Sequence, residues 1–266
     1  VSRVDDLSGC CHDGSKGCGE SCEGFFPVGF NGDISAWDSS SVTTMKYTFT
    51  GAGAFNMPLD WDTSRLTMMD GTFRSASVFN TPLDWDTSRV TSMIGTFREA
   101  KAFDSELAWD TSSVTSMYQT FWHAAIFDQP LEWDTSSVTD LYQTFEEAGA
   151  FDQPLAISRW DVSKVTLMES LFANTALASD DCSKQELREA WKDVAAFTSA
   201  HDWSAAVCRG VFADRAALKA AVDEWIADNS AAAAAHGASS GWDVSRVDDL
   251  SGCCYESSKG CGDSCD

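Results

Sequence analysis

The sequence predicts a β-rich solenoid of 24-residue coils with helical, disulfide-linked caps. Three features lead to this fold class: a tryptophan that recurs every 24 residues, phenylalanine columns in step with it, and ten cysteines that mostly fall into two clusters. Such periods are typical of repeat proteins, in which each coil buries its apolar side only against the coils above and below it. We therefore expect like side chains to lie over like side chains from coil to coil.

The repeat follows the consensus F-[ND]-x-P-L-x-W-D-T-S-x-V-T-x-M-x-x-T-F-x-x-A-x-x. The predicted core ladder consists of the tryptophans Trp37, Trp61, Trp85, Trp109, Trp133 and Trp160. Two phenylalanine columns accompany it, namely Phe49, Phe73, Phe97, Phe121, Phe145 and Phe172, and Phe55, Phe79, Phe103, Phe127 and Phe151. Stacked coils with parallel strands about 4.8 Å apart would place these rings in continuous internal columns.

Within a coil, P-L-x-W predicts a short extended segment, D-T-S a tight turn, and the remainder a second short strand or helical turn. The aspartate after each tryptophan can accept a backbone N–H bond in that turn. Calcium bound between coils is the alternative, and its candidate ligands are Asp38, Asp62, Asp86, Asp110, Asp134 and Asp161. We favour turn capping, because one carboxylate per coil lacks the clustered ligands of calcium loops.

The ten cysteines predict disulfides. They form two clusters of CC-x6-C-x3-C and one separated pair, namely Cys10, Cys11, Cys18 and Cys22, then Cys253, Cys254, Cys261 and Cys265, and finally Cys182 with Cys208. This spacing lacks the C-x2-C pairs and histidines usual for zinc, so we favour disulfides over metal. Connectivity within a cluster stays open. Disulfides indicate an oxidising compartment, either extracellular or at the cell surface.

After about Thr175 the period stops and helical signals follow. A first helix is expected after the N-cap candidates Asp181, Cys182 and Ser183, with one apolar face made of Leu187, Ala190, Trp191 and Val194. A second is expected from near Asp214, with an apolar face made of Leu218, Ala221, Val222, Trp225 and Ile226. Because the open end of a solenoid needs a cover, we expect these helices to cap it, with Cys182 and Cys208 joined across the first cap.

The last 23 residues nearly repeat the first 23, with every cysteine in register. A single domain has no physical need to restart its first motif, so we interpret the chain as one module of a tandem array. The expected segments are a cysteine-rich junction (1–24), a solenoid of about six coils (25–176), a helical cysteine-linked cap (177–212), a helix and connector (213–240) and the start of the next module (241–266). The absence of a starting methionine suggests an excerpt or a processed chain.

The charge restricts the classes of partner. With 41 acidic and 18 basic residues, the net charge is −23. Such a chain repels phosphate backbones and anionic lipid, so we expect no nucleic-acid partner. No apolar run is long enough to cross a bilayer, so we expect no membrane insertion.

The sequence contains no recognisable set of catalytic residues. We therefore expect that the chain is not an enzyme and that it binds no cofactor, apart from the calcium alternative given above. The four histidines, His12, His123, His201 and His236, lack partners at a recognisable spacing and are expected on the surface. Two threonine columns could form an ice-facing array, and hydrogen bonding along a ladder explains them equally well. The columns are Thr43, Thr67, Thr91, Thr115 and Thr139, and Thr48, Thr72, Thr96, Thr120 and Thr144. The Trp122-His123 pair could mark an exposed contact for a glycan or protein.

The W-D-[TV]-S-x-V-T-x-M cores from Trp37 to Met168 resemble the BspA-like surface-protein repeats, a variant of the leucine-rich repeat found in bacterial surface lipoproteins and in proteins of microalgae. The segment FNGDISAWD, residues 30–38, is especially similar. The CC-x6-C-x3-C insertions after Leu7 and Leu250 depart from that pattern. The resemblance implies a leucine-rich-repeat-like architecture and a role in adhesion or in a surface scaffold, and it specifies no activity.

Together these observations predict a non-enzymatic structural module of an extracellular tandem-repeat protein. Its partners would be neighbouring copies of itself in a surface fibre or appendage. The alternative is a cell-surface adhesin that binds a glycan or a protein on the solenoid face. A polysaccharide-cleaving enzyme is a third possibility, but it needs converging acids or a basic cluster that the sequence does not offer.

Overall fold

The computed structural model describes residues 6–8, 24–206, 220–223, 225–226 and 235. The chain divides into two compact units, Val1–Ala205 and Ala206–Asp266. In the described residues the elements are the helix α1 (Pro154–Ile157), the 3-10 helix η1 (Leu177–Ser179), the helix α2 (Asp181–Ala190) and the helix α3 (Ala195–Ala200). In the second unit, residues 220–223, 225–226 and 235 are helical, and the rest of the helix expected from Asp214 lies outside the described residues.

The predicted fold class is wrong. The described ranges contain no β-strand and no sheet, only isolated parallel bridges between single residues of neighbouring repeats, such as Thr44 with Met68 and Met68 with Ser92. They also contain no complete disulfide, because Cys182 is their only cysteine. Cys182 is disulfide-bonded, and the other nine predicted disulfide cysteines, Cys208 among them, lie outside the described residues. A β-rich solenoid therefore does not describe this structure.

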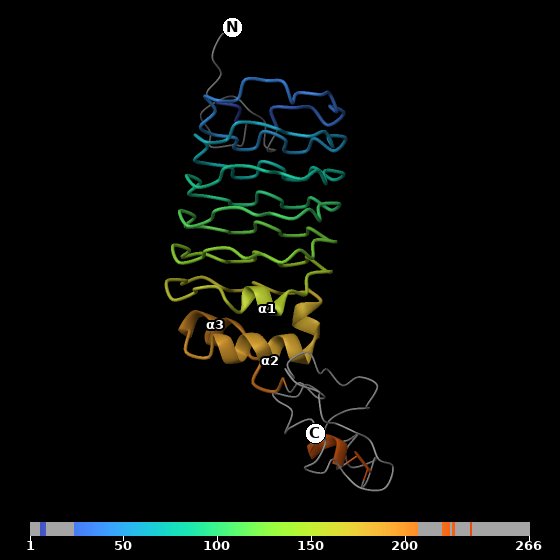
Figure 1. Cartoon of the computed structure of the whole chain (residues 1–266), viewed down its shortest axis with the longest axis vertical. Helices are drawn as coiled ribbons and strands as arrows, with labels where there is room; N and C mark the ends of the chain where they lie inside the picture. The colour runs from blue at the N-terminus through green and yellow to red at the C-terminus, as the bar shows by residue number, and fades with distance from the viewer. Residues whose placement is uncertain (1–5, 9–23, 207–219, 224, 227–234, 236–266) are drawn as a thin grey trace, which may run out of the picture. The chain divides into compact units, whose positions relative to one another are not determined.

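Instead, the first unit is a stack of turn-rich loops, one per repeat (Figure 1). Alternate backbone N–H groups donate to carbonyls 23 residues later, as Met45 N does to Met68 O at 2.9 Å and Phe49 N to Thr72 O at 2.8 Å. Between them, N–H groups bond back within the loop, as Thr48 N does to Met45 O at 3.2 Å. These four-residue turns prevent a strand, although neighbouring loops still pair.

Two left-handed residues in each repeat produce these turns. One position is occupied by Tyr47, Gly71, Gly95, Gln119, Gln143 and Ser170, and the second by Gly51, Ser75, Glu99, His123, Glu147 and Asn174, all with φ between 54° and 70°. An extended strand needs a strongly negative φ at every residue. In each repeat, two left-handed residues four positions apart therefore replace the predicted second strand with a run of turns.

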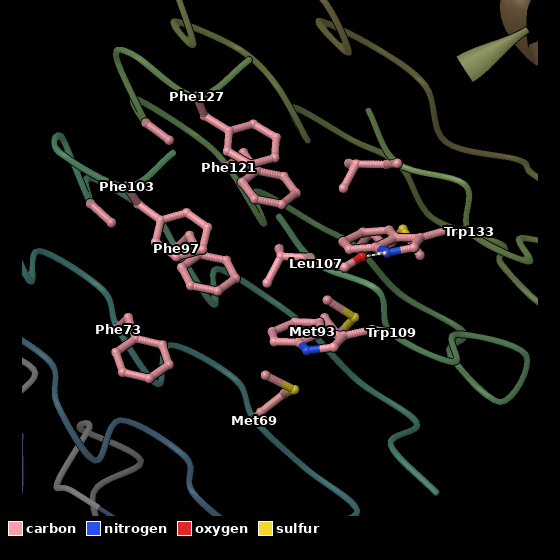
Figure 2. Packing of buried hydrophobic residues seen from close by; sticks show 14 of the residues in the cluster. Met69, Phe73, Met93, Phe97, Phe103, Leu107, Trp109, Phe121, Phe127 and Trp133 are labelled. Carbon is pink, nitrogen blue, oxygen red and sulfur yellow. Dashed lines mark hydrogen bonds between the residues drawn. The ribbon is translucent and has the colours of Figure 1, made fainter. Parts of the chain in front are cut away.

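The core is formed by aromatic columns that run through the stack (Figure 2). Phe97, Phe121 and Phe145 lie parallel at centroid distances of 5.5 Å, and Phe103 and Phe127 at 6.0 Å. Trp109 and Trp133 stack at 6.2 Å. From Trp61 onward, each ladder indole N–H donates to a backbone carbonyl of the preceding repeat, as Trp133 Nε1 does to Leu107 O at 3.1 Å. Each tryptophan thereby fixes both the packing and the register of its loop.

The longer spacing before Trp160 is absorbed by helix α1 (Pro154–Ile157). Trp160 still stacks on Trp133 at 6.3 Å, and its indole N–H still donates to Leu131 O at 3.0 Å. The additional residues form one helical turn at the edge of the loop, so the core register is preserved.

The inner threonine column ties consecutive loops together. In Thr72, Thr96, Thr120 and Thr144 the hydroxyl is shared between a carbonyl of its own loop and one of the preceding loop, as Thr120 Oγ1 is between Met117 O at 2.8 Å and Met93 O at 2.9 Å. Thr72, Thr96, Thr120 and Thr144 are fully buried. The ice-facing alternative is therefore wrong for this column.

We expect Thr120→Val to lower the free energy of unfolding by about 1–3 kcal/mol, because two buried carbonyls lose a donor while the side-chain volume is retained. Thr115→Val is the matched control, since the exposed Thr115 hydroxyl makes one bond of 3.1 Å to Thr91 O. The measurement is chemical denaturation of both variants. Equal losses would contradict the assignment of the inner column as a structural tie.

At the C-terminal end of the stack, helices α2 and α3 cover the last repeat. Asp180 caps α2 by accepting the Ser183 N–H at 2.6 Å. Trp191 stacks on Phe172 at 6.4 Å and meets Phe197 of α3 edge-on at 5.3 Å. Because Leu187, Trp191 and Phe197 are buried, these helices close the aromatic column at Phe172.

Candidate interaction surface

The candidate calcium ligands cap turns, as the sequence analysis favoured. Each carboxylate accepts the backbone N–H of the serine two residues later at 2.9–3.2 Å, in the set Asp38, Asp62, Asp86, Asp110, Asp134 and Asp161. Hydrogen bonds from those serines lower the pKa of Asp62, Asp86, Asp110, Asp134 and Asp161. Among the described residues, no group of three His, Cys, Asp or Glu side chains is placed to hold a metal ion. The geometry gives these aspartates a structural task in the turn.

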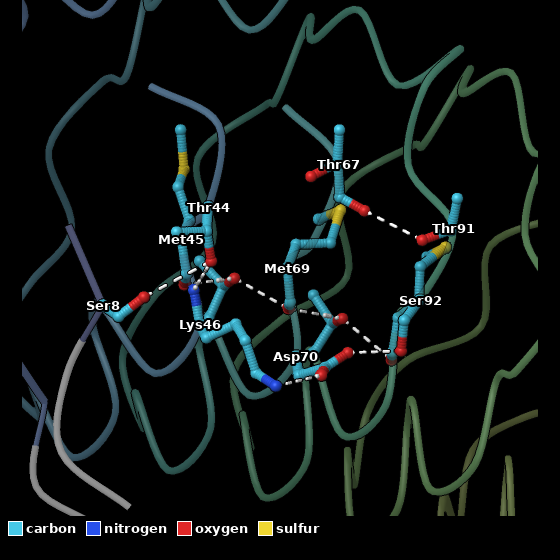
Figure 3. Close-up of polar contacts among 12 residues, drawn as sticks. Ser8, Thr44, Met45, Lys46, Thr67, Met69, Asp70, Thr91 and Ser92 are labelled. Atoms are coloured by element: carbon cyan, nitrogen blue, oxygen red, sulfur yellow. Dashed lines mark hydrogen bonds and ion pairs between the residues drawn. The ribbon is translucent and has the colours of Figure 1, made fainter. Parts of the chain in front are cut away.

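One face of the stack does not repeat. The positions on either side of each core methionine or leucine follow no consensus along the stack and hold first Thr44, Met68, Ser92, Ser116, Asp140 and Leu167, then Lys46, Asp70, Ile94, Tyr118, Tyr142 and Glu169. Lys46 pairs with Asp70 at 3.0 Å (Figure 3), and Tyr118 stacks on Tyr142 at 5.6 Å. Because these side chains do not serve the core, this non-repeating face is the part of the stack whose chemistry is specific to each repeat.

Trp122 and His123 lie beside this face and are engaged within the chain. The Arg98 guanidinium lies 4.3 Å from the centre of the Trp122 ring, and Trp122 Nε1 donates to Glu146 at 2.9 Å. His123 lies 3.6 Å from the Glu147 carboxylate. The exposed contact that the sequence suggested is thus a partly buried polar network.

A shallow groove crosses the edge of the fourth and fifth loops. It is lined by Glu106, Leu107, Ala108, Trp109, Pro130, Glu132 and Trp133. Glu106 stands where the neighbouring repeats have proline, and Ala108 stands where they have aspartate or glutamate. The small Ala108 side chain leaves a hollow that carboxylates and indole edges border, and the sequence interpretation missed it. The departure of two neighbouring positions from the consensus is the signal that could have found it.

His201 differs from the sequence expectation of a surface histidine. Its ring lies among Phe197 and Trp203, both at 5.0 Å, and Phe172 at 6.0 Å. Both ring nitrogens are buried, with no hydrogen-bond partner among the described residues. Burial lowers the pKa of His201, and the backbone of Phe197 and the charge of Glu169 oppose that shift only in part. His12 and His236 lie outside the described residues.

We expect acid to weaken the helical end of the stack through His201. Because its pKa is lower in the folded chain than the value of about 6.5 in the unfolded chain, the unfolded chain binds the proton first, and stability falls as the pH falls below about 6.5. Urea denaturation at pH 7 and pH 5 measures this loss. His201→Phe should reduce it, whereas His123→Gln, at a partly exposed histidine, should retain it. An unchanged pH dependence in His201→Phe would contradict the assignment.

At the end of the stack opposite to the helices, apolar side chains of the described residues are exposed. Trp37 is 46% exposed, whereas the other ladder tryptophans, Trp61, Trp85, Trp109, Trp133 and Trp160, are at most 5% exposed. Phe25 and Val28 are also exposed there, and the Phe25 and Trp37 rings both contact Phe26, at 5.0 and 5.8 Å. We call Phe25, Val28 and Trp37 the N-terminal end face.

Within the described residues, no helix combines the length and the apolar character that a bilayer span needs. No curated protein and no solved structure matches the chain. One family model does match, over residues 25–108 and again over residues 107–208, and its description is Mycoplasma protein of unknown function, DUF285. Since the two matches together cover well over half of the chain, the protein belongs to the DUF285 family.

Proposed function

We propose that the chain is a non-enzymatic structural module of an extracellular tandem-repeat protein, which builds a surface fibre or appendage by end-to-end self-association. The observation that supports this proposal is that the core contacts run from each loop to the next. The aromatic columns, the indole bonds and the inner threonine bonds all join one loop to the next, and the same contacts recur along the stack. A module of this kind transmits load along its axis through backbone hydrogen bonds and packed rings.

Three further features fit this proposal. The resemblance of the W-D-T-S-x-V-T-x-M cores to BspA-like surface proteins agrees with a role at the cell surface. The net charge of −23 would keep neighbouring stacks apart laterally, so that association is directed to their ends. The disulfide-bonded Cys182 fits an oxidising, extracellular compartment.

Electron microscopy and light scattering of the purified chain over a range of concentrations test this proposal. The expected result is linear assemblies whose length grows with concentration. Single particles of constant mass at every concentration would overturn it. A matched sample at high salt separates lateral repulsion from end-to-end attraction, because screening removes the repulsion and leaves apolar end contacts in place.

A second function, a cell-surface adhesin, is favoured by the groove between Glu106 and Trp133. Carboxylates beside indole edges can accept hydrogen bonds from a glycan while offering it apolar contacts. The test is a glycan array with the natural chain and with Glu106→Pro, which restores the proline of the neighbouring repeats. Asp84→Ala, at the position in the preceding repeat that is equivalent to Ala108, is the control. Binding that only Glu106→Pro abolishes would favour the adhesin.

A further inference from the structure

Two tyrosines lie one over the other on the non-repeating face. The Tyr118 and Tyr142 rings belong to neighbouring loops, with 5.6 Å between their centroids and an angle of 9° between their planes. Both side chains are half-buried, so one part of each ring is open to solvent. The loops on either side place Ile94 and Glu169 at the same position, so the two phenols form an isolated pair rather than part of a longer column.

The core of the stack does not require this pair. The equivalent position holds lysine, aspartate, isoleucine and glutamate in the other repeats, whereas the core positions hold phenylalanine, tryptophan or methionine almost throughout. The chain has only four tyrosines, and two of them occupy this one position in consecutive loops. A chemical property of the phenol, rather than packing, is therefore the feature that distinguishes this pair.

Hydrogen bonds fix the two loops beside the pair. Gln119 N donates to Tyr142 O at 3.0 Å, and Gln119 Nε2 donates to Gln143 Oε1 at 2.6 Å. The Tyr142 N–H donates to Asp140 Oδ1 at 2.9 Å. The two backbones therefore keep neighbouring positions, while the half-buried rings can turn about their side-chain bonds on a much shorter timescale than the loops separate.

Disulfides cannot join the loops in this part of the stack. From residue 23 to residue 181 the sequence contains no cysteine. Backbone hydrogen bonds, threonine hydroxyls and packed side chains hold these loops to one another. A bond between aromatic side chains of two neighbouring loops would be a covalent tie that cysteine chemistry does not supply there.

We propose that Tyr118 and Tyr142 form a modification site at which oxidation couples the two phenols into dityrosine, a carbon–carbon bond between neighbouring loops. The oxidant is hydrogen peroxide, acting through a haem peroxidase. Each phenol loses one electron and one proton and becomes a phenoxyl radical. The two radicals join through the ring carbons next to the oxygen-bearing carbon, and the hydrogen on each of these carbons moves to the oxygen and restores the phenol. Hydrogen peroxide accepts the two electrons and two protons and leaves as two water molecules.

The stacked arrangement favours coupling within the chain. Two radicals on separate chains must meet by diffusion, whereas these rings are already neighbours at 5.6 Å. Holding two reacting groups together raises their effective concentration by several orders of magnitude. The rings must turn from a face-to-face to an edge-to-edge arrangement, which the fixed backbones and half-exposed side chains permit. Because both tyrosines belong to one chain, this site does not depend on the proposed fibre.

Oxidation of the dilute chain by hydrogen peroxide and a haem peroxidase tests the site. Mass spectrometry of a proteolytic digest should identify a peptide pair joined through Tyr118 and Tyr142 that lacks two hydrogen atoms. Tyr118→Phe and Tyr142→Phe keep a stacked ring without the phenol, and each should lower the dityrosine fluorescence at least about tenfold. Tyr47→Phe is the matched control, because Tyr47 lies in a different loop, and it should leave the yield unchanged.

Two results would overturn the proposal. One is a dityrosine yield in Tyr118→Phe equal to that of the natural chain. The other is the absence of the joined peptide under conditions in which N-acetyltyrosine in the same solution is coupled.

The stability of the coupled chain gives a second measurement. A bond between the loops restrains the unfolded chain, so the denaturant midpoint should rise after oxidation. Tyr118→Phe treated in the same way corrects for oxidation elsewhere, for example at Met68, which is 41% exposed. A midpoint of the coupled chain no higher than that of the treated variant would show that the bond does not fit the folded stack, and would count against the site.

Discussion

Phe121→Ala is expected to lower the free energy of unfolding by about 3–5 kcal/mol, the range for removing a fully buried phenylalanine. Phe121 lies between Phe97 and Phe145, at 5.5 Å from each, and 4.1 Å from Phe127 in the second column. Because its ring contacts the loops on both sides, the cavity would interrupt the column in the middle of the stack. Chemical denaturation, monitored by tryptophan fluorescence and by circular dichroism, measures the loss.

The matched control for Phe121→Ala is Phe25→Ala at the N-terminal end face. Phe25 is 50% exposed and meets Phe26 on one side only, so its removal should cost well under half as much. Phe121→Leu keeps most of the volume and should fall between the two. A loss in Phe121→Ala no larger than that in Phe25→Ala would show that the columns do not hold the stack together.

The register of the stack could be predicted from the sequence, whereas its secondary structure could not. Residues 24 apart, such as Phe97 and Phe121, occupy equivalent positions because one side chain must pack on the next. The strand prediction failed because β-branched and aromatic residues were interpreted as extended chain. The left-handed positions that prevent a strand are held by Tyr47, Gln119 and Gln143 as well as by glycines, so residue type does not reveal them. Only neighbouring loops, through their hydrogen bonds, impose that conformation.

The candidate surfaces were less predictable than the core. The aspartates after the tryptophans could be interpreted from sequence as turn caps, because an Asx turn depends only on residues two apart. The burial of His201 depends on α2 and α3 folding back over Phe172, which no local pattern specifies. The groove at Ala108 likewise arises from one small residue beside larger neighbours in other loops. Local chemistry was readable in the sequence, whereas contacts between distant segments were not.

Gly71→Ala is expected to destabilise the chain considerably more than Gly95→Ala. Both glycines occupy the left-handed position of their repeat with φ of 58°, so alanine at either site carries a backbone cost of about 1–2 kcal/mol. A Cβ atom on Gly71 would additionally lie 2.3 Å from Cδ1 and 2.5 Å from Cε1 of the Tyr47 ring, whereas on Gly95 its nearest neighbour would be Cβ of Arg98 at 3.6 Å. The difference between the two variants therefore isolates the clash with Tyr47.

The clash in Gly71→Ala can be relieved without changing its backbone. In the double variant Tyr47→Ala/Gly71→Ala, the ring that meets the new Cβ is absent, so the second substitution should cost only as much as Gly95→Ala does in the natural chain. Tyr47 also has a left-handed backbone, and its N–H donates to Asp70 O at 2.8 Å. Its replacement therefore has a cost of its own, and Tyr47→Ala alone is the reference in the double-mutant cycle. Denaturant midpoints of the four chains give the coupling energy. A coupling near zero would mean that the Tyr47 ring moves aside freely, and that neighbouring loops are less tightly packed at this position than the described contacts require.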